Sequence, residues 1–282
     1  MDGFFFIDKQ IDWTSRDVCN KIEHLFNLKK VGHIGTLDPF ATGLLIVSVN
    51  NATKAGTFIH ESHKEYIATL LLGSKTDTLD NSGTIIEEKE VPNLDIDTIK
   101  NVLDSFLGEY KQIPPMTSAI KVKGVKLYDL AHQGIEIERK ERTCLIKDIS
   151  FISYQNNELT FKATASKGTY IRVLGEDIAI KLNTVGHLIS LRRTKIDNFD
   201  VKDALKIDEL STNNLHSIYE ILSKVLSTYI IKEEEINKIK NGVNLKIDSN
   251  KDKLLIVDKD NNALAVYIKI KDNTYKCLRG LW

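Results

Sequence analysis

The sequence of 282 residues has no long apolar run, no net charge and few cysteines. No apolar segment approaches the ~20 residues that a membrane-spanning helix needs. The short apolar stretch at residues 4–7 follows Asp2, whereas a secretory leader begins with positive charge and has a longer apolar core. These absences argue against a membrane or secreted protein, and we expect a cytoplasmic one.

Cysteine is both scarce and odd in number, with only Cys19, Cys144 and Cys277. Their wide spacing fits neither a disulfide framework nor a zinc site, so we expect reduced, mostly buried thiols. The sequence also has no phosphate-binding loop and no dinucleotide-binding glycine motif. Two aspartates in the turn-rich segment 73–83 miss the spacing of a calcium loop. We therefore expect no metal and no cofactor.

The positive and negative side chains balance, with 39 Lys and Arg against 39 Asp and Glu. Zero net charge counts against a protein with a strongly basic nucleic-acid-binding domain. The charges are unevenly spread, however. Residues 161–195 hold seven basic and two acidic side chains, and residues 111–126 hold four Lys and no acid. Phosphate contacts need only local charge, so these two stretches leave room for RNA binding.

Hydrophobic periodicity predicts an α+β protein with a mixed, mainly antiparallel sheet. Apolar or alternating runs indicate strands at residues 4–7, 44–49, 64–72, 143–154 and 158–166. One helix should follow the capping residues Thr14 and Ser15. Another should run from a cap at Asp97 and Thr98 through Phe106. A third should open near Arg172. The buried face of the first helix should consist of Val18, Ile22, Leu25 and Phe26.

The character of the chain changes near residue 227. Short strands at 254–257, 263–270 and 275–278 are joined by turns rich in Asp and Asn. We expect a large domain at residues 1–226 and a small β-rich module at residues 227–282. An extension that only packs on the main domain is one interpretation of this module.

Residues 31–45 combine three glycines, one histidine, one aspartate and one proline ahead of a buried strand. Glycine allows tight turns and close approach of a ligand to the backbone. Pro39 fixes its own φ and keeps Asp38 away from helical conformation. The pattern predicts a stiff loop that presents the Asp38 carboxylate. An ordinary Asp-Pro turn is the alternative.

Residues 32–45 read GHIGTLDPFATGLL. They resemble the signature loop of the TruB family of tRNA pseudouridine synthases, G-H-x-G-T/A-L-D-P-x-A-T-G-L-L. Other segments resemble the family as well: KEY at 64–66, TDTLD at 76–80, GTYIR at 168–172 and GHLISLRR at 186–193. Residues 8–15 are similar to D-K-P-x-G-x-T-S, but Gln10 and Asp12 replace the Pro and Gly. Residues 114–134 resemble the family's mobile RNA-binding thumb, with His132 in place of an Arg.

The resemblance implies a pseudouridine synthase fold and a C-terminal PUA-like RNA-binding module. The implied activity is conversion of a T-loop uridine of tRNA (position 55) to pseudouridine without a cofactor. The implied catalytic residues are Asp38 as nucleophile, Tyr66 against the target base and as candidate proton acceptor, and Arg172. Assistance to tRNA folding is a further expectation, and we expect a monomer whose partner is the tRNA T-arm.

The implied substrate-binding residues are His33, which would stack and hold the RNA open, Tyr66, and the pocket residues Tyr170 and Leu191. The expected contacts to the RNA backbone are Lys121, Lys123, Arg192 and Arg193. A turn structure is implied for residues 73–83.

The residues themselves are compatible with this chemistry. An aspartate is already ionised at pH 7 because its reference pKa is ~3.9, so Asp38 needs only positioning. A helix start disfavours cations, so Arg172 should have a carboxylate partner there, for which we expect Asp38. Tyrosine is a poor base at its reference pKa of ~10. Tyr66 is therefore either a base with assistance or a core aromatic.

Several alternatives stay open at this point. From the sequence alone, His33 would be the first candidate for the catalytic base. The chemical route can be attack on C1′, a glycal path or attack on C6. The protein could bind or fold RNA without chemistry. A carboxylate-dependent hydrolase usually needs a second catalytic carboxylate, and the loop around Asp38 offers none.

Overall fold

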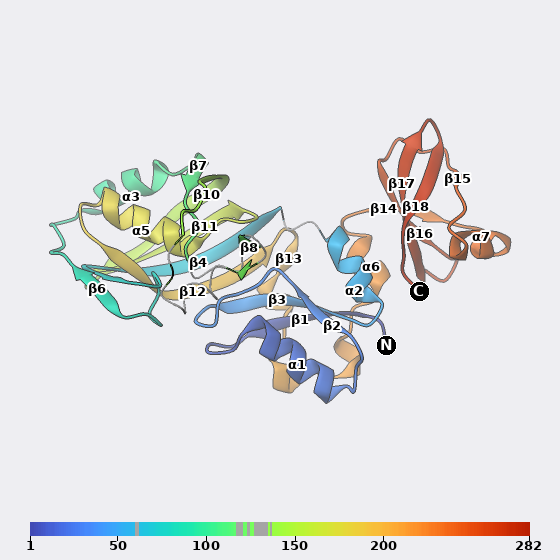
Figure 1. Cartoon of the computed structure of the whole chain (residues 1–282), viewed down its shortest axis with the longest axis horizontal. Coiled ribbons are helices and arrows are strands. Elements are labelled where there is room, and N and C mark those ends of the chain that lie inside the picture. Colours follow the sequence, from blue (N-terminus) through green and yellow to red (C-terminus); the bar gives the residue numbers. More distant parts are fainter. Residues whose placement is uncertain (60–61, 117–120, 123–124, 127–134, 136) are drawn as a thin grey trace. The chain divides into compact units, whose positions relative to one another are not determined.

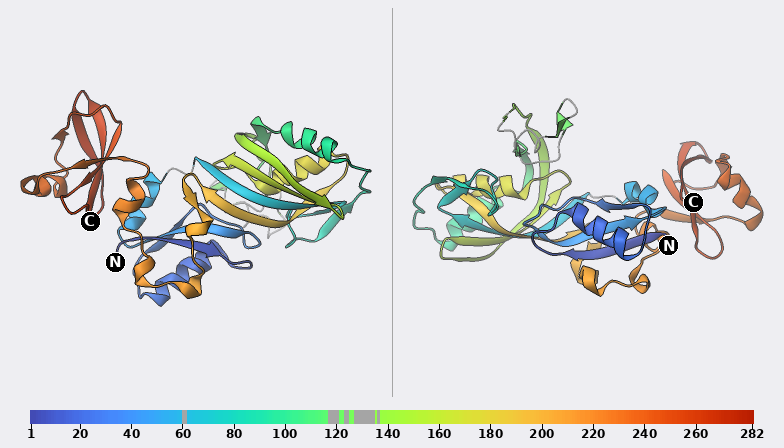
Figure 2. Two further views of the ribbon diagram at one scale, coloured as in Figure 1. Left: turned by 180° about the vertical axis from the view of Figure 1, so that it is seen from behind. Right: turned by 60° about the horizontal axis from the view of Figure 1, so that its bottom comes forward.

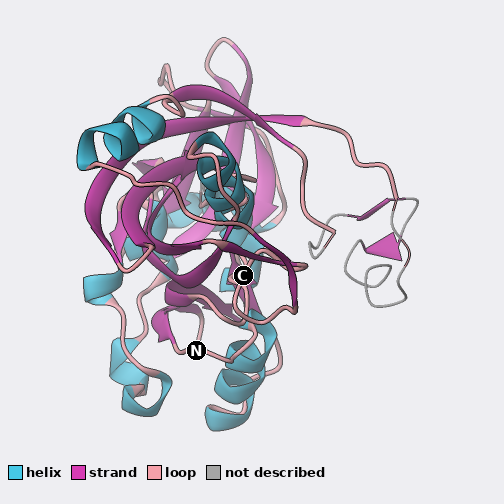
Figure 3. Ribbon diagram, turned by 90° about the vertical axis from the view of Figure 1, so that its left-hand side faces the viewer, coloured by secondary structure: helices cyan, strands magenta, loops and turns pink. Residues whose placement is uncertain are grey.

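The computed structural model describes residues 1–282 except 60–61, 117–120, 123–124, 127–134 and 136, and it divides into two compact units (Figure 1). The first unit consists of Met1–Pro39, Gly43–His60 and Asp200–Trp282, and the second of Phe40–Thr42 and Glu61–Phe199. Strands predominate over helices in the described part (Figure 3). The predicted α+β class with mainly antiparallel strands is confirmed.

The amino-terminal part of the first unit is built on β3 (Thr42–Val49), which pairs antiparallel with β1 (Gly3–Lys9) and β2 (Val31–Ile34). Seven of the eight residues of β3 are buried, as expected for a continuous apolar run. The segment after residue 199 returns to β1, where His216 and Phe4 exchange main-chain hydrogen bonds. The short elements of this unit are α2 (Ala52–Ala55), η1 (Gly56–Phe58), η2 (Val201–Asp203), η3 (Ile207–Glu209), η4 (Thr212–Asn214) and α6 (Ile218–Leu222).

Helix α1 (Ser15–Leu25) begins where the sequence predicted, because Thr14 and Asp17 form a reciprocal capping box. Val18 and Ile22 are buried as expected. The prediction for Leu25 is wrong: the helix ends at this residue, and its side chain is 48% exposed. Phe26, just past the helix end, stacks on Phe5 with ring centroids 5.2 Å apart.

The second unit is organised around an antiparallel sheet in the order β12-β4-β11-β10-β7. Its strands are β4 (His63–Leu72), β7 (Gly108–Gln112), β10 (Arg142–Gln155), β11 (Glu158–Ser166) and β12 (Gly186–Ile196), with β13 (Phe199–Asp200) beside β12. Two small hairpins consist of β5 (Ser74–Thr76) with β6 (Ile85–Glu88) and of β8 (Lys121–Val122) with β9 (Val125–Lys126).

Helices α3 (Ile96–Asp104) and α5 (Ile171–Lys181) cover one face of this sheet (Figure 2). Helix α3 starts two residues earlier than predicted, because Asp95 is the cap and accepts a hydrogen bond from the Thr98 N–H. Gly175 lets α5 lie close to the sheet. A Cβ there would be only 2.9 Å from Leu188 Cδ2 and 3.4 Å from Leu70 Cδ1.

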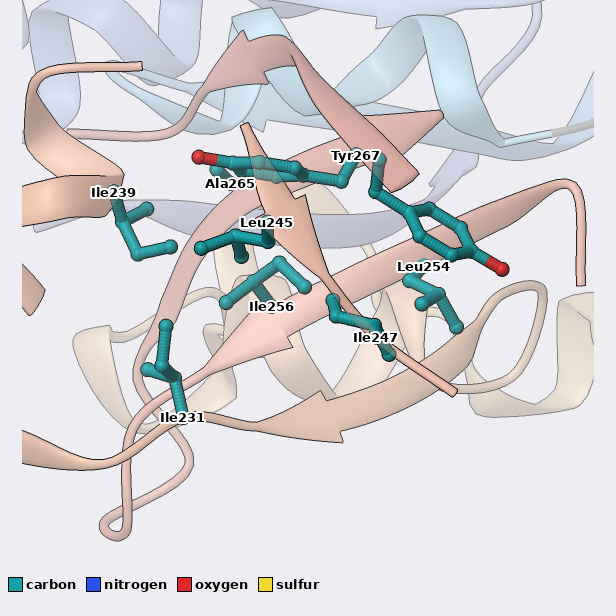
Figure 4. Packing of buried hydrophobic residues seen from close by; sticks show 9 residues of the cluster. Ile231, Ile239, Leu245, Ile247, Leu254, Ile256, Ala265 and Tyr267 are labelled. Atoms are coloured by element: carbon teal, nitrogen blue, oxygen red, sulfur yellow. The ribbon is translucent and has the colours of Figure 1, made fainter. Parts of the chain in front are cut away.

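The carboxyl-terminal residues form a five-stranded sheet in the order β14-β16-β17-β18-β15. Its elements are β14 (Ser227–Ile230), η5 (Glu233–Glu235), α7 (Ile236–Lys240), β15 (Leu245–Lys246), β16 (Lys253–Val257), β17 (Ala263–Lys271) and β18 (Thr274–Gly280). Figure 4 shows its apolar core, where Tyr267 lies among aliphatic side chains. Tyr267 and Tyr275 are both fully buried. The β-rich character expected here is present, and the domain boundary at residue 226 stays a prediction.

Candidate active site

The loop that carries Asp38 joins β2 to β3, and it is tied down on both sides of that residue. Gly35 has a φ of +69°, a conformation that favours glycine. The Ser15 hydroxyl accepts a hydrogen bond from the Leu37 N–H (2.9 Å) and donates one to the Leu37 carbonyl (3.1 Å). This one side chain therefore holds both main-chain groups of the residue before Asp38.

A buried lysine holds the other side of the loop. Lys9 is 1% exposed, and its ammonium group donates to the carbonyls of Gln10 (2.9 Å), Trp13 (2.6 Å) and Pro39 (3.1 Å). These three bonds use the three donors of the ammonium group. The Asp12 N–H adds a further bond to the Pro39 carbonyl. Asp38, itself half-buried, is thus presented from a backbone fixed at both neighbours.

His33 lies in β2, three residues before Thr36 of the loop, and both of its ring nitrogens have partners. Nδ1 lies 3.6 Å from the Cys19 Sγ, and Nε2 lies 3.1 Å from the Thr36 hydroxyl. Burial raises the pKa of Cys19 to about 11, so its thiol stays protonated at neutral pH. These contacts orient the half-buried ring.

In the second unit, Tyr66 lies at the centre of β4 and is 8% exposed. Its neighbours across the two adjacent strands are Ala163 on β11 and Arg193 on β12. Leu191 lies opposite Ala68, one position further along the same face. The structure therefore brings Tyr66 and Leu191 together on the sheet face that α5 covers.

Arg172 is the second residue of α5, and its side chain is 4% exposed. Its Nη1 donates to the Thr78 carbonyl (2.8 Å) and lies 3.3 Å from the Asp80 carboxylate. Asp80 is held in turn by the Thr78 hydroxyl (2.9 Å) and by the N–H and hydroxyl of Ser82. A carboxylate partner for Arg172 is confirmed, but it is Asp80 of the predicted turn. The expected pairing with Asp38 stays a prediction.

The expected RNA-backbone contacts have different outcomes. Arg192 is half-buried, and its Nη1 lies 3.5 Å from the Thr42 hydroxyl. Arg193 is 0% exposed, so the expected direct contact to phosphate does not agree with its position beside Tyr66. Lys121 is placed by its backbone in β8, whereas Lys123 lies outside the described residues.

Tyr170, at the start of α5, is half-buried and forms the N-cap position of that helix. Its main chain contacts the side chain of Gln112 on β7. Sequence reasoning missed Lys9, Ser15 and Asp80 as positioning residues. The sequence signals that could have identified these residues are the segments DKQIDWTS and TDTLD. Their resemblance to the family suggested only a loop and a turn.

Within the described residues, no three His, Cys, Asp or Glu side chains are grouped so that they could hold a metal ion. No helix in the same part of the chain is long and apolar enough to cross a bilayer.

Comparison with known proteins identifies relatives of this chain. The model of the TruB family pseudouridylate synthase (N terminal domain) matches residues 23–171. A protein named tRNA pseudouridine synthase B from Mesoplasma florum is 35% identical over 279 residues, covering 99% of this chain and 97% of its own. The protein of that name from Clostridium kluyveri is 39% identical over 287 residues, covering 99% of both chains.

A crystal structure of a Cbf5-Nop10-Gar1 complex contains a chain with the same fold. The TM-score is 0.74 at 21% identity, and the match covers 99% of this chain and 85% of that one. The full-length relatives and the family model together establish that this chain belongs to the TruB family of pseudouridylate synthases.

Proposed function

We propose that this chain converts a T-loop uridine of tRNA to pseudouridine, with Asp38 as the nucleophile. The observation that carries the proposal is the Asp38 loop, whose sequence fits the family signature and whose backbone is fixed by Lys9 and Ser15. Curated relatives that match over their full length are named tRNA pseudouridine synthase B. The fixed loop suits a carboxylate that must meet one sugar or base atom accurately.

The reaction detaches uracil from C1′, turns the base and rejoins it through C5. A carboxylate can hold the sugar or the base during this exchange, because the bond that it forms can break again. The reaction involves no net oxidation, so Asp38 needs no redox partner. A proton must leave C5, and Tyr66, buried on the sheet face under α5, is the candidate acceptor or relay.

The target base must leave the RNA stack to react. Unstacking costs a few kcal/mol, and each base–aromatic stack returns about 1–3 kcal/mol. Tyr66 is our candidate to stack on the base, with Tyr170 and Leu191 lining its pocket. His33 would stack in the vacated place. Arg172, held by Asp80, would supply positive charge near the reacting carboxylate.

The substrate that we propose is the T-arm of tRNA, bound by the chain as a monomer in the cytoplasm. Lys121, Lys123 and Arg192 would contact its phosphates. We infer that residues 227–282 form a PUA-like module that adds RNA contacts outside the reaction centre, and that binding can assist tRNA folding.

Release of tritium from a T-arm stem-loop labelled at C5 of uridine tests the proposal, because only the isomerase replaces that hydrogen. The wild-type protein should release tritium, and Asp38→Asn should bind the same RNA with no release. Asparagine suits an ordinary turn at this position. Near-normal tritium release by Asp38→Asn would therefore overturn the assignment of Asp38 as the nucleophile. No tritium release by the wild-type protein would overturn the proposed function.

A further inference from the structure

The edge strand β7 is held against α5 at two places. Tyr110 and Gln112 are two residues apart, so their side chains leave the same face of the strand, and both are buried. The Tyr110 hydroxyl donates to the Asp177 carboxylate in the middle of α5. Gln112 reaches the start of the same helix. The strand therefore fixes both the position and the beginning of α5.

The Gln112 side chain forms two hydrogen bonds with the main chain of Tyr170. Its Oε1 accepts from the Tyr170 N–H at 2.7 Å, and its Nε2 donates to the Tyr170 carbonyl at 3.4 Å. The side chain is only 3% exposed, and the Cys144 thiol lies 3.7 Å from Oε1 on the adjacent strand. This buried amide thus binds both main-chain polar groups of Tyr170, and it also interacts with the Cys144 thiol and the Tyr110 hydroxyl.

That residue is where helix α5 begins. Tyr170 is the N-cap, and its own side chain makes no capping hydrogen bond. The first N–H groups of a helix need partners from outside the helix. Gln112 supplies a partner to Tyr170, two residues before Arg172, whose guanidinium holds Asp80. A displaced helix start would move both the Tyr170 ring and the buried ion pair.

We propose that Gln112 is a positioning residue for the reaction: its amide fixes the start of α5 and so aligns Tyr170 and the Arg172–Asp80 pair. The inference rests on the proposed function. Gln112 acts through the backbone of Tyr170 and has no role in the chemistry itself. Its loss should therefore lower kcat for pseudouridine formation more than it changes the KM for RNA.

Gln112→Glu provides the sharpest test, because its protonated form reproduces both bonds. A carboxylic acid accepts through its carbonyl oxygen and donates through its O–H. The ionised form loses the donor and sets a negative charge against the Tyr170 carbonyl oxygen. Burial raises the pKa of such a carboxyl, so both forms should be populated between about pH 5 and pH 8.

The measurement is the kcat of Gln112→Glu divided by that of the wild-type protein at each pH. The ratio should fall by about tenfold or more as the pH rises, since a misplacement of ~1 Å can cost 10²-fold. Gln112→Leu should be slow at every pH. Hydrogen exchange at the Tyr170 amide should be faster in Gln112→Leu than in the wild-type protein.

Tyr110→Phe is the comparison variant, because it removes the bond to Asp177 and the interaction of the Tyr110 hydroxyl with the Gln112 amide but keeps the bond from the Tyr170 N–H to Gln112. It should lower stability and leave kcat close to that of the wild-type protein. A pH-independent ratio for Gln112→Glu, or full kcat for Gln112→Leu, would overturn the inference alone. A wild-type protein that makes no pseudouridine would overturn the proposed function and this inference with it.

Discussion

The surroundings of Asp38 and of Arg172 show two ways to fix a functional side chain. Asp38 is half-buried, and the bonds that hold its loop go to the main chain of its neighbours, Leu37 and Pro39. Arg172 is buried, and its own guanidinium is bound to a carbonyl and to the Asp80 carboxylate. If Asp38 is the nucleophile, as we propose, its carboxylate must reach the substrate, and fixing the backbone on either side positions it without covering it. A charge that stays in the protein can be fixed directly.

Removing the carboxylate from the Arg172 centre should have the largest effect on stability. Asp80→Asn leaves a buried guanidinium beside an uncharged amide, and breaking a buried pair costs about 3–5 kcal/mol. Urea unfolding measures the loss. The matched control is Asp77→Asn in the same turn, since exposed Asp77 only accepts from the Thr84 N–H, which an Asn oxygen can also do. Equal stability of the two variants would contradict the buried pair.

Lys9→Met, which alters the support of the Asp38 loop, should have an intermediate effect on stability. It keeps an apolar stem but removes the ammonium donor from the carbonyls of Gln10 and Trp13 and one of two donors from that of Pro39. Each buried group left unsatisfied costs about 1–3 kcal/mol. Both unfolding free energy and turnover should fall, because the Pro39 carbonyl keeps only its bond from the Asp12 N–H and loses its link to Lys9. The exposed Lys21→Met on α1 is the control and should change stability by less than about 0.5 kcal/mol. Normal turnover by a folded Lys9→Met protein would argue against backbone positioning of Asp38.

The smallest effect is expected from Lys121 and Lys123, which belong to neither centre. Changing Lys121 and Lys123 together to Ala should weaken T-arm binding and lower the slope of log K against log salt by about 0.7–0.9 for each lost phosphate contact. Turnover at saturating RNA should persist. Binding titrations at several salt concentrations measure this. An unchanged slope would remove these two lysines from the RNA surface.

The local parts of this architecture could be predicted from sequence, and the long-range polar contacts could not. Thr14 predicts the start of its helix, because the capping residue and its partner Asp17 lie only three residues apart in the sequence. The Asp38 loop is equally local. Hydrophobic periodicity could not pair Arg172 with Asp80. The turn around Asp80 and the helix that begins near Arg172 are each predicted from local residues, and neither prediction depends on the other segment. The prediction that Arg193 contacts RNA phosphate fails for a related reason. Its charge suggested a surface position, whereas the alternation of side chains along β12 places it on the buried face.

The three thiols happen to fall one in each structural region, which has a practical consequence. Cys19 lies on the buried face of α1, Cys144 on β10, and Cys277 on β18 of the carboxyl-terminal sheet. Cys19 is fully buried with a pKa raised to about 11, so an alkylating reagent at neutral pH can reach a reactive thiolate there only after α1 has detached. Cys144 is also buried and Cys277 partly so. Following the three alkylation rates by mass spectrometry would therefore time the opening of each region in the unaltered protein.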